Sequence, residues 1–470
     1  MPLPRRIFMP LIVACGLFME SLDTTAIATA LPAIAAGLGR DPTELKLALT
    51  AYLLSLAVFI PASGWLADRF GARNVFSVAI TLFAIGSLSC GFAQSLAHLI
   101  CSRILQGVGG AMMVPVARLI ILRSVQKSEL LNSMAWFTVP ALFGPIIGAP
   151  LSGFITTYFS WRWIFWINAP IGVLGLILAT RYIPDIRGET QSRLDLRGFA
   201  LTAVGLCGVI TGITALGFHG IEPTLAVLLL VFGAASLVAY VMVSRGHPNP
   251  FLDLDLFRIS SFRHAVLGAA LVRAGVGATP FLFPLMLQTG LGMSPLASGL
   301  TTFTSAIGAI TMKFTARPIL RRLGFRRTLI GNSLLIGALT ALAALFSTTT
   351  PLALISGLLL ASGFFRSLQF TSINALTFAD VPPARMSRAT SISSVTQQVA
   401  ISLGITIGAL AVELSRRAHG DASPTMSNFV IAFPLVGAIT AVSALVFLRL
   451  RPDAGDDVSG RQLRQPKHRV

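Results

Sequence analysis

The chain has 470 residues, of which 54% are hydrophobic and only 11% are charged. Soluble globular proteins usually carry about 25% charged residues, and a water-soluble fold of this length does not bury so much apolar surface. The composition therefore excludes an ordinary soluble domain and predicts an all-α integral membrane protein. The net charge of +18 does not indicate nucleic-acid binding, because the basic residues lie in short clusters between apolar runs and form no basic domain.

Fourteen apolar runs are long enough to cross a membrane, which takes about 20 residues in a helix. They cover 8–36, 46–66, 74–93, 96–121, 130–157, 162–182, 197–217, 223–244, 263–289, 295–316, 327–347, 351–377, 389–413 and 428–449. With the N-terminus inside, the outer connections hold only Arg40, Lys46, Arg162, Arg416 and Arg417, whereas most of the 36 Lys and Arg lie at inner connections. Because cytoplasmic connections are rich in Lys and Arg, we expect both termini in the cytoplasm.

The chain also repeats a short pattern. Segment 65–73 (WLADRFGAR) resembles segment 318–326 (PILRRLGFR), and each follows the second span of a six-span set. The simplest organisation has an N-terminal six-helix bundle, a linker with two additional spans, a C-terminal six-helix bundle and a cytoplasmic tail, at 1–182, 183–261, 262–450 and 451–470. Repeats of this kind place a substrate site near the bilayer midplane, between the halves.

The first span carries two carboxylates, Glu20 and Asp23, three residues apart and so on one helical face. A charge at the bilayer centre costs roughly 3 kcal/mol, so such groups face a cavity or a partner. Arg103 in the fourth span must also pair, and an acidic group of the first span is a candidate. Proton coupling through Glu20, Asp23 and Arg103 is one interpretation, and a purely structural contact between helices is the other.

The connection between the second and third spans predicts a gating loop. Its residues Gly64, Asp68, Arg69, Gly71 and Arg73 lie within ten positions. Gly71 can take a positive φ in a tight turn, and Asp68 can lie near a helix N-terminus or pair with an arginine. Such a contact would hold the halves in one conformation, and an ordinary basic connection is the alternative.

The fifth span is dense in small and kinking residues, at Pro140, Gly144, Pro145, Gly148, Pro150 and Gly153. Small residues spaced along one face allow close helix packing, and proline bends a helix. We expect a closely packed, bendable helix at a moving interface, with a merely kinked span as the alternative.

Two arginines of the C-terminal half, Arg273 and Arg366, lie well inside predicted spans, together with Gln288, Gln369 and Asn374. They predict a polar, cationic wall of a substrate cavity that could meet an anionic solute. Structural pairing with helix carbonyls is the alternative.

No pattern of an enzyme occurs. The sequence has no GxxxxGK[ST] loop for ATP, no HExxH and no GxSxG, and its six histidines are dispersed. We therefore expect no cofactor and no metal site, and an energy source other than ATP.

Several segments resemble motifs of the major facilitator superfamily. Segment 64–73 resembles its signature between the second and third helices. Segment 22–32 (LDTTAIATALP) resembles the first-helix motif of its fourteen-helix drug:proton antiporters, the EmrB/QacA type. Further segments that resemble family motifs are 103–110, 144–153, 161–170, 284–288 and 369–374. One subgroup of the family is similar to this chain in segments 64–69 and 109–118 and at Arg273.

This resemblance, over about residues 8–450, implies a major facilitator fold and export of drugs or small metabolites in exchange for protons. It implies roles for Asp23 and Arg103 in coupling and for Asp68 in gating. Two departures bear on these roles: Ala149 and Pro150 replace a usual Gly-Gly pair, and Ala72 occupies a usually basic position.

We thus expect a proton-driven, alternating-access efflux antiporter of the bacterial inner membrane. Its partners would be a small-molecule substrate, protons and membrane lipid, with no nucleic acid, and a periplasmic adaptor protein is an open possibility for this monomer. An importer of a small, anionic metabolite and a non-transporting receptor are the alternatives, although no signalling domain follows Arg451.

Overall fold

The computed structural model describes residues 5–455, apart from 125–129, 185–194, 216–221, 246–249, 383–384 and 422. Most of the expected tail, 456–470, lies outside the described residues. The α-helices run in the order α1 (Arg5–Leu38), α2 (Lys46–Phe59), α3 (Ala62–Phe70), α4 (Ala72–Gly91), α5 (Leu96–Ser124), α6 (Leu130–Tyr158), α7 (Trp163–Trp166), α8 (Asn168–Tyr182), α9 (Leu196–Ala215), α10 (Pro223–Ser244), α11 (Ser260–Gly277), α12 (Thr279–Leu285), α13 (Pro295–Leu342), α14 (Leu352–Ala379), α15 (Met386–His419) and α16 (Met426–Phe447). Two 3-10 turns (Leu254–Arg258 and Ala343–Leu345) and a π turn (Met286–Gly290) complete the described helical structure.

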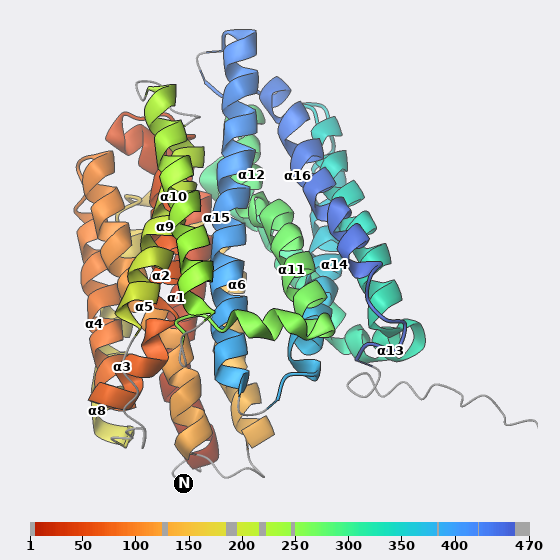
Figure 1. Ribbon diagram of the computed structural model, residues 1–470. Coiled ribbons are helices and arrows are strands. Elements are labelled where there is room, and N and C mark those ends of the chain that lie inside the picture. The colour runs from red at the N-terminus through yellow and green to blue at the C-terminus, as the bar shows by residue number, and fades with distance from the viewer. Residues whose placement is uncertain are drawn as a thin grey trace, which may run out of the picture.

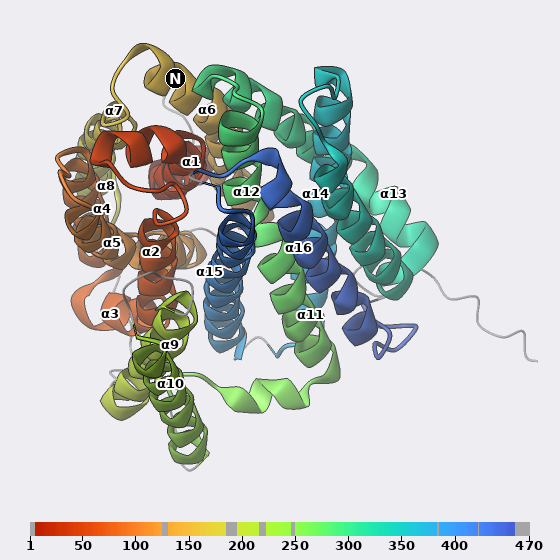
Figure 2. The ribbon, with the colours of Figure 1, turned by 90° about the horizontal axis from the view of Figure 1, so that it is seen from above.

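The helices form two groups that lie side by side (Figures 1 and 2). One group contains α1, α2 and α4–α8, and the other contains α11–α16. The pair α9–α10 packs together beside the seam between the groups, where α9 touches both α2 and α15. A small apolar cluster at this seam joins Val58 of α2, Leu206 of α9 and Val395 of α15.

The number of spans differs from the expected fourteen. Among the described residues, eleven helices are long and apolar enough to cross a membrane, or twelve if the bent pair α2–α3 is one span. The other two predicted spans coincide with α6 and with the first part of α13, which are helical but outside that set. The expectation of fourteen spans is therefore not confirmed, although an all-helical membrane architecture is.

The second span is also bent, which the sequence analysis did not foresee. The axes of α2 and α3 meet at 57°, next to Pro61, which cannot donate a backbone hydrogen bond and crowds the preceding turn. Most residues of the predicted gating loop therefore belong to the short helix α3. Only Gly71 lies between α3 and α4.

The internal repeat is visible in the backbone. Gly71 has φ 88° between α3 and α4, and Gly324 has φ 75° at a break within α13. The two glycines occupy the same position in segments 65–73 and 318–326. A positive φ disfavours any residue with a Cβ, so both copies of the repeat need glycine to reverse the chain between helices.

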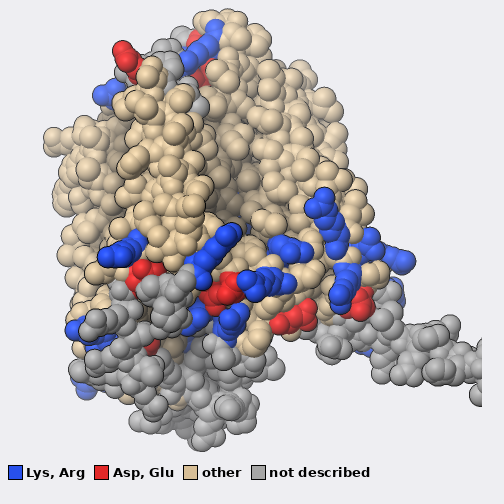
Figure 3. Space-filling view, viewed as in Figure 1, with Lys and Arg blue, Asp and Glu red and all other residues tan. Residues whose placement is uncertain are grey.

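Charges gather at the two ends of the molecule. Figure 3 shows a band of Lys and Arg across one end, which we call the basic end, and a smaller mixed group at the opposite end, which we call the far end. The N-terminus of α1 lies at the basic end (Figure 1), and the α1–α2 connection lies at the far end. In this view the surface between the ends shows almost no Lys, Arg, Asp or Glu, as a lipid-facing belt requires.

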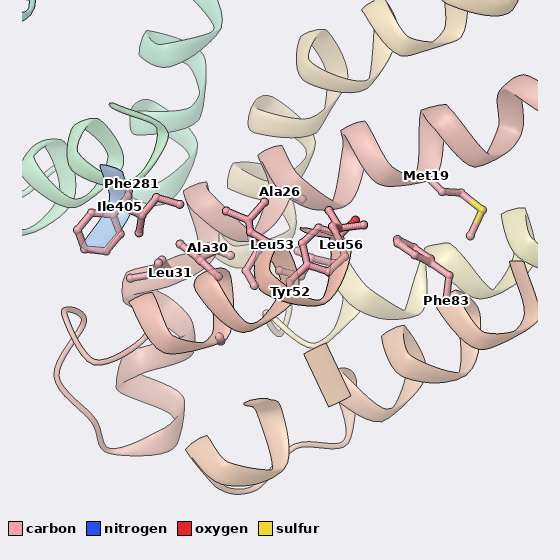
Figure 4. Packing of buried hydrophobic residues seen from close by; sticks show 14 of the residues in the cluster. Met19, Ala26, Ala30, Leu31, Tyr52, Leu53, Leu56, Phe83, Phe281 and Ile405 are labelled. Atoms are coloured by element: carbon pink, nitrogen blue, oxygen red, sulfur yellow. The ribbon is translucent and has the colours of Figure 1, made fainter. Parts of the chain in front are cut away.

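The main hydrophobic cluster crosses from one group of helices to the other. Ala26 and Leu31 of α1 belong to the same cluster as Phe281 of α12 and Ile405 of α15 (Figure 4). The two groups therefore share apolar surface close to the polar residues of α1, which is where the cavities described below lie.

Close helix crossings depend on glycine, as at α13 and α14. A Cβ on Gly363 would collide with the backbone of Ser305, and one on Gly308 would collide with the backbone of Leu360. Gly357, on the same helix α14, has open space around it.

We therefore predict that Gly363→Ala lowers the free energy of unfolding by roughly 1–3 kcal/mol, the usual cost of overpacking. Thermal unfolding of the purified protein in detergent measures this effect. The control variant Gly357→Ala should unfold at the wild-type temperature, and equal behaviour of the two variants would contradict the crossing described.

Candidate functional site

A buried ion pair joins α1 to α5. The Arg103 guanidinium donates to the Asp23 carboxylate at 2.5 Å, and both side chains are 1% exposed. Gln106 bridges the pair: its amide donates to Asp23 at 2.8 Å, and its carbonyl accepts from Arg103 at 2.7 Å. The structure thus brings together the predicted residues Asp23 and Arg103 and adds Gln106, which holds both charges in register.

Tyr52 of α2 completes this charged cluster. The guanidinium carbon of Arg103 lies 4.1 Å from the centre of the Tyr52 ring, a distance at which a cation is attracted to an aromatic face. Tyr52 can come so close because Gly107 lies against its backbone carbonyl, 2.7 Å from where a Cβ would be. The glycine at position 107 thus lets α2 pack closely against α5 beside the ion pair.

Sequence reasoning missed Gln106 and Tyr52. Gln106 follows Arg103 by three residues, so the two lie on one helical face, and a polar residue in an apolar span is a signal that could have been used. Nothing in the sequence marks Tyr52, because its position over Arg103 depends on how α2 packs against α5.

Glu20 lies apart from the ion pair and lines a cavity of about 360 Å³. Its carboxylate makes no hydrogen bond or ion pair with any described residue, whereas Asp23 has two partners. Tyr52 and Arg103 line the same cavity, and Gln397 and Gln398 contribute its wall from α15. Glu20 can take up a proton without breaking an ion pair, but Asp23 cannot.

Two glycines of α6 fit this helix closely to α1. A Cβ on Gly144 would lie 2.5 Å from the side chain of Ser21, and one on Gly148 would lie 3.0 Å from Thr25. Ser152 adds a hydrogen bond of 2.6 Å to the Ala26 carbonyl. The predicted close packing of this span is therefore present along the helix that carries Glu20 and Asp23.

Helix α6 also touches the second half of the molecule near the far end. A Cβ on Gly153 would lie 2.6 Å from the Pro295 carbonyl oxygen, and a Cβ on Gly299 of α13 would lie 2.5 Å from the Ala149 carbonyl oxygen. Pro150 borders this contact. Pro140 and Pro145 also fall within α6, and their side chains lie outside the described residues.

The predicted gating residues lie at the basic end of the first half. Asp68 and Arg69 are in the last turn of α3, Gly71 reverses the chain, and Arg73 is in the first turn of α4. The Arg69 guanidinium lies 5.9 Å from the Trp65 ring centre. Gly71, the residue before α4, has no side chain that could cap this helix. Gly64 has open space around it.

A second cavity, of about 510 Å³, lies between the halves and is lined by Arg366 and Asn374 of α14. Arg366 donates to the Thr279 hydroxyl at 3.1 Å. Arg273 stands behind the wall, 5% exposed, and donates to the Asn374 carbonyl at 3.3 Å. Three of the five predicted cavity residues are thus grouped at one wall.

The other two predicted cavity residues line neither of these cavities. Gln288 donates to the backbone carbonyl of Thr29 at 2.8 Å and so ties the second half to α1. Gln369 is fully buried and bonds to Asn332 and Ser333 of α13 within its own half. Their positions are those of structural contacts.

A cluster of charges at the far end was not anticipated. Glu413, which is 4% exposed, accepts hydrogen bonds from Arg416 at 2.9 Å and from Arg417 at 2.8 Å. Arg416 also lies 3.9 Å from Asp41, across the seam in the first half, and the buried Lys46 interacts electrostatically with Glu413. These residues close the far end of the seam.

Within the described residues, no three His, Cys, Asp or Glu side chains gather to hold a metal ion.

We predict that Arg103→Gln destabilises the protein by roughly 3–5 kcal/mol, because it leaves the Asp23 charge buried without its partner. The double variant Asp23→Asn/Arg103→Gln should lose less, since no net charge then remains. Thermal unfolding in detergent measures both, with Arg118→Gln on the same helix as the control. Additive losses in the double variant would contradict the coupling of the two residues.

Comparison with known proteins places this geometry in a family. The model of the Major Facilitator Superfamily matches residues 13–248 and 265–469. The chain is 36% identical to the multidrug resistance protein MdtD of Pectobacterium atrosepticum over 444 residues, which is 94% of this chain and 95% of that protein. It is 37% identical to MdtD of Klebsiella pneumoniae over 448 residues, 95% of each chain. Segments 64–69 and 109–118 resemble MdtD- and HsrA-like members of the family. The two MdtD relatives agree with that resemblance.

Solved structures agree on the fold. A POT family transporter in complex with 5-aminolevulinic acid has a TM-score of 0.71 at 15% identity and covers 96% of this chain and 97% of its own. A D-xylose-proton symporter has a TM-score of 0.69 at 16% identity and covers 95% and 98%. From its motifs, its fold and these relatives, the chain is a multi-pass membrane transporter, not an enzyme, and belongs to the major facilitator superfamily.

Proposed function

We propose that this protein is a proton-coupled antiporter that exports drugs or small metabolites across the bacterial inner membrane. The relatives named multidrug resistance protein support export of small molecules. The basic end would then face the cytoplasm together with both termini, and the proton-motive force would supply the energy without a cofactor. A monomeric state and an adaptor in the periplasm remain predictions from the sequence.

The observation that carries this proposal is the position of the two carboxylates of α1. Asp23 is sealed in its contact with Arg103 and Gln106, while Glu20, one helical turn away, lines a cavity to which both halves contribute. A proton acceptor beside a substrate cavity, next to an ion pair that joins two helices, has the parts that proton-driven transport requires.

Protonation of a carboxylate on α1 would change the contacts that hold this helix against its neighbours. A proton on Asp23 neutralises the partner of Arg103 and weakens the contact between α1 and α5. Because α6 packs on α1 through Gly144 and Gly148 and touches α13 near the far end, a shift of α1 would be passed to the seam between the halves. We assign proton coupling to Asp23, Glu20 and Arg103 on this basis, and the moving interface to the glycines and prolines of α6.

Alternating access would consist of rocking between the bundles 1–182 and 262–450, with 183–261 as the linker. The seam is closed at the far end by Arg416 with Asp41 and by α6 against α13, so we propose that the cavities belong to a state that accepts substrate from the cytoplasm. Gly64, Asp68, Arg69, Gly71 and Arg73 would form the gate at the basic end. Arg366 and Asn374, with Arg273 behind them, would form the substrate wall.

The energy is adequate for export. One positive charge that moves inward gains about 2.3 kcal/mol per 100 mV, which corresponds to more than a tenfold concentration ratio of substrate. The coupling needs only that the proton and the substrate do not occupy the cavity together.

Proton flux tests the proposal. A library is first screened for compounds that raise the unfolding temperature in detergent, and the strongest stabiliser is added to proteoliposomes with an imposed pH gradient. We expect the compound to dissipate the gradient, and antiport is contradicted if no stabilising compound does so.

In the same assay, Asp23→Asn should abolish pH-driven transport, because the side chain can no longer gain or lose a proton, and Glu20→Gln should reduce it. Glu222→Gln, an exposed carboxylate before α10, is the control and should transport at the wild-type rate. Undiminished transport by Asp23→Asn would remove Asp23 from coupling.

Import of a small anionic metabolite is the competing function, and the pair Arg273 and Arg366 is the observation that favours it. Accumulation of the compound in inverted but not in right-side-out vesicles would support export, and the opposite result would support import.

The far-end charges generate a further prediction. Glu413→Gln removes the carboxylate that gathers Arg416 and Arg417, so the far end should open more often. A cysteine placed at Ala149 in a variant without its four native cysteines should then react severalfold faster with a membrane-impermeant maleimide added from outside. Glu44→Gln, which removes a carboxylate without a described ion pair at the same end, should leave the rate unchanged, and an unchanged rate in Glu413→Gln would contradict the role of the cluster.

A further inference from the structure

The charges at the centre of the molecule are unequally balanced between the halves. In the first half, Arg103 has a carboxylate partner. In the second half, neither Arg273 nor Arg366 forms an ion pair with any described residue. A guanidinium among membrane helices is costly without compensation, so these two charges call for an anion that the described part of the chain does not supply.

Arg366 presents free donors to the cavity of about 510 Å³. Its bond to Thr279 uses one terminal nitrogen, and the other terminal nitrogen has no hydrogen bond to a described residue. The Nε is buried and does not face the cavity. A guanidinium offers five N–H donors and no acceptor. The described lining offers this guanidinium hydroxyl oxygens but no carboxylate, and a charged acceptor is what a carboxylate, sulfonate or phosphate group would bring.

Arg273 sets the polarity of the neighbouring amide. Because it donates to the Asn374 carbonyl oxygen at 3.3 Å, the Asn374 amide nitrogen is left to donate. Asn374 lines the cavity and makes no other hydrogen bond to a described residue. Arg366 and Asn374 together thus offer donors only.

The carboxylate of Glu20 lies on the opposite side of the same central space. Its cavity and that of Arg366 share the lining residues Thr24, Thr25, Ala28 and Pro280, so the two are adjacent along α1. Each cavity also has aromatic lining, from Phe281 in the cavity of Glu20 and from Phe283 and Phe370 in the cavity of Arg366. The two adjoining cavities therefore carry opposite charges and apolar, aromatic surface.

We propose that the substrates of this transporter are dipolar amphiphiles that carry an oxyanion, such as a carboxylate, bound by Arg366 and Asn374, and a cationic group directed at Glu20. This inference rests on the proposed function as a small-molecule exporter and names the class of substrate. Arg273 is a positioning residue in it, since it acts through Asn374.

Two dyes of one scaffold test the oxyanion site. Rhodamine 110 has a free carboxylate and a cationic ring system, and rhodamine 123 is its methyl ester, so the dyes differ only in the anion. Fluorescence polarisation with the purified protein in detergent should show binding of rhodamine 110 about tenfold or more tighter, as expected for a hydrogen bond between charged groups.

The variants locate the effect. Arg366→Gln should bring the two affinities to within about twofold of each other, the loss falling on rhodamine 110, and Arg366→Lys should keep part of the preference. Asn374→Asp is a second route if Arg366→Gln does not fold, because its new carboxylate can pair with Arg273. It should weaken rhodamine 110 selectively, through repulsion and the loss of the amide donor.

The outcomes separate this inference from the proposed function. Equal affinities in the wild type, binding of neither dye, or a preference that survives Arg366→Gln and Asn374→Asp would overturn the oxyanion site. Dissipation of a pH gradient by rhodamine 123 alone would overturn it as well and would leave antiport standing. A carboxylate preference without any proton flux would support the oxyanion site and contradict antiport.

Discussion

The buried contact between Asp23 and Arg103 is the constraint around which the first half is arranged. Two opposite charges at this depth depend on each other and on further hydrogen bonds. Gln106 bonds to both charged groups and the face of Tyr52 lies over the guanidinium, whereas the Arg103 Nε is buried without a hydrogen-bond partner. Glycines on α5 and α6 then let the neighbouring helices pack closely around the pair, and α1 itself also contacts α12 and α13 of the second half.

The second half solves the same problem differently. Its two central arginines have amide, hydroxyl and aromatic neighbours in place of carboxylates. The first half thus leaves the Glu20 carboxylate at one cavity, and the second half leaves the Arg366 guanidinium at the adjoining one. Under the inference drawn above, a transporter with this arrangement would distinguish substrates by where their charges lie, in addition to their size and apolar character.

Much of the architecture could be predicted from sequence because membrane helices obey local rules. Length and apolarity located every helix of the two groups, and the glycine in the connection after the second span indicated a tight turn, which the structure has at Gly71 with a positive φ. The bend at Pro61 and the helical form of segment 62–70 were missed, because a periodic apolar run does not reveal where a helix changes direction. Gln288 and Gln369 were assigned to the cavity because polar residues in spans suggest function, but they instead bind the backbone of α1 and the side chains of α13.

By itself the sequence determined that this is a helical membrane protein of the major facilitator type, with Glu20, Asp23, Arg103, Arg273 and Arg366 as charges that topology does not explain. These conclusions follow from composition, spacing and motif, which are properties of the chain alone. Only the tertiary structure decided that Asp23 is paired while Glu20 faces a cavity, and that Arg366 has no carboxylate partner among the residues described. Those distinctions depend on which helices pack against α1 and α14. Residues three apart on one helix can face different neighbours, because the neighbours come from distant parts of the chain.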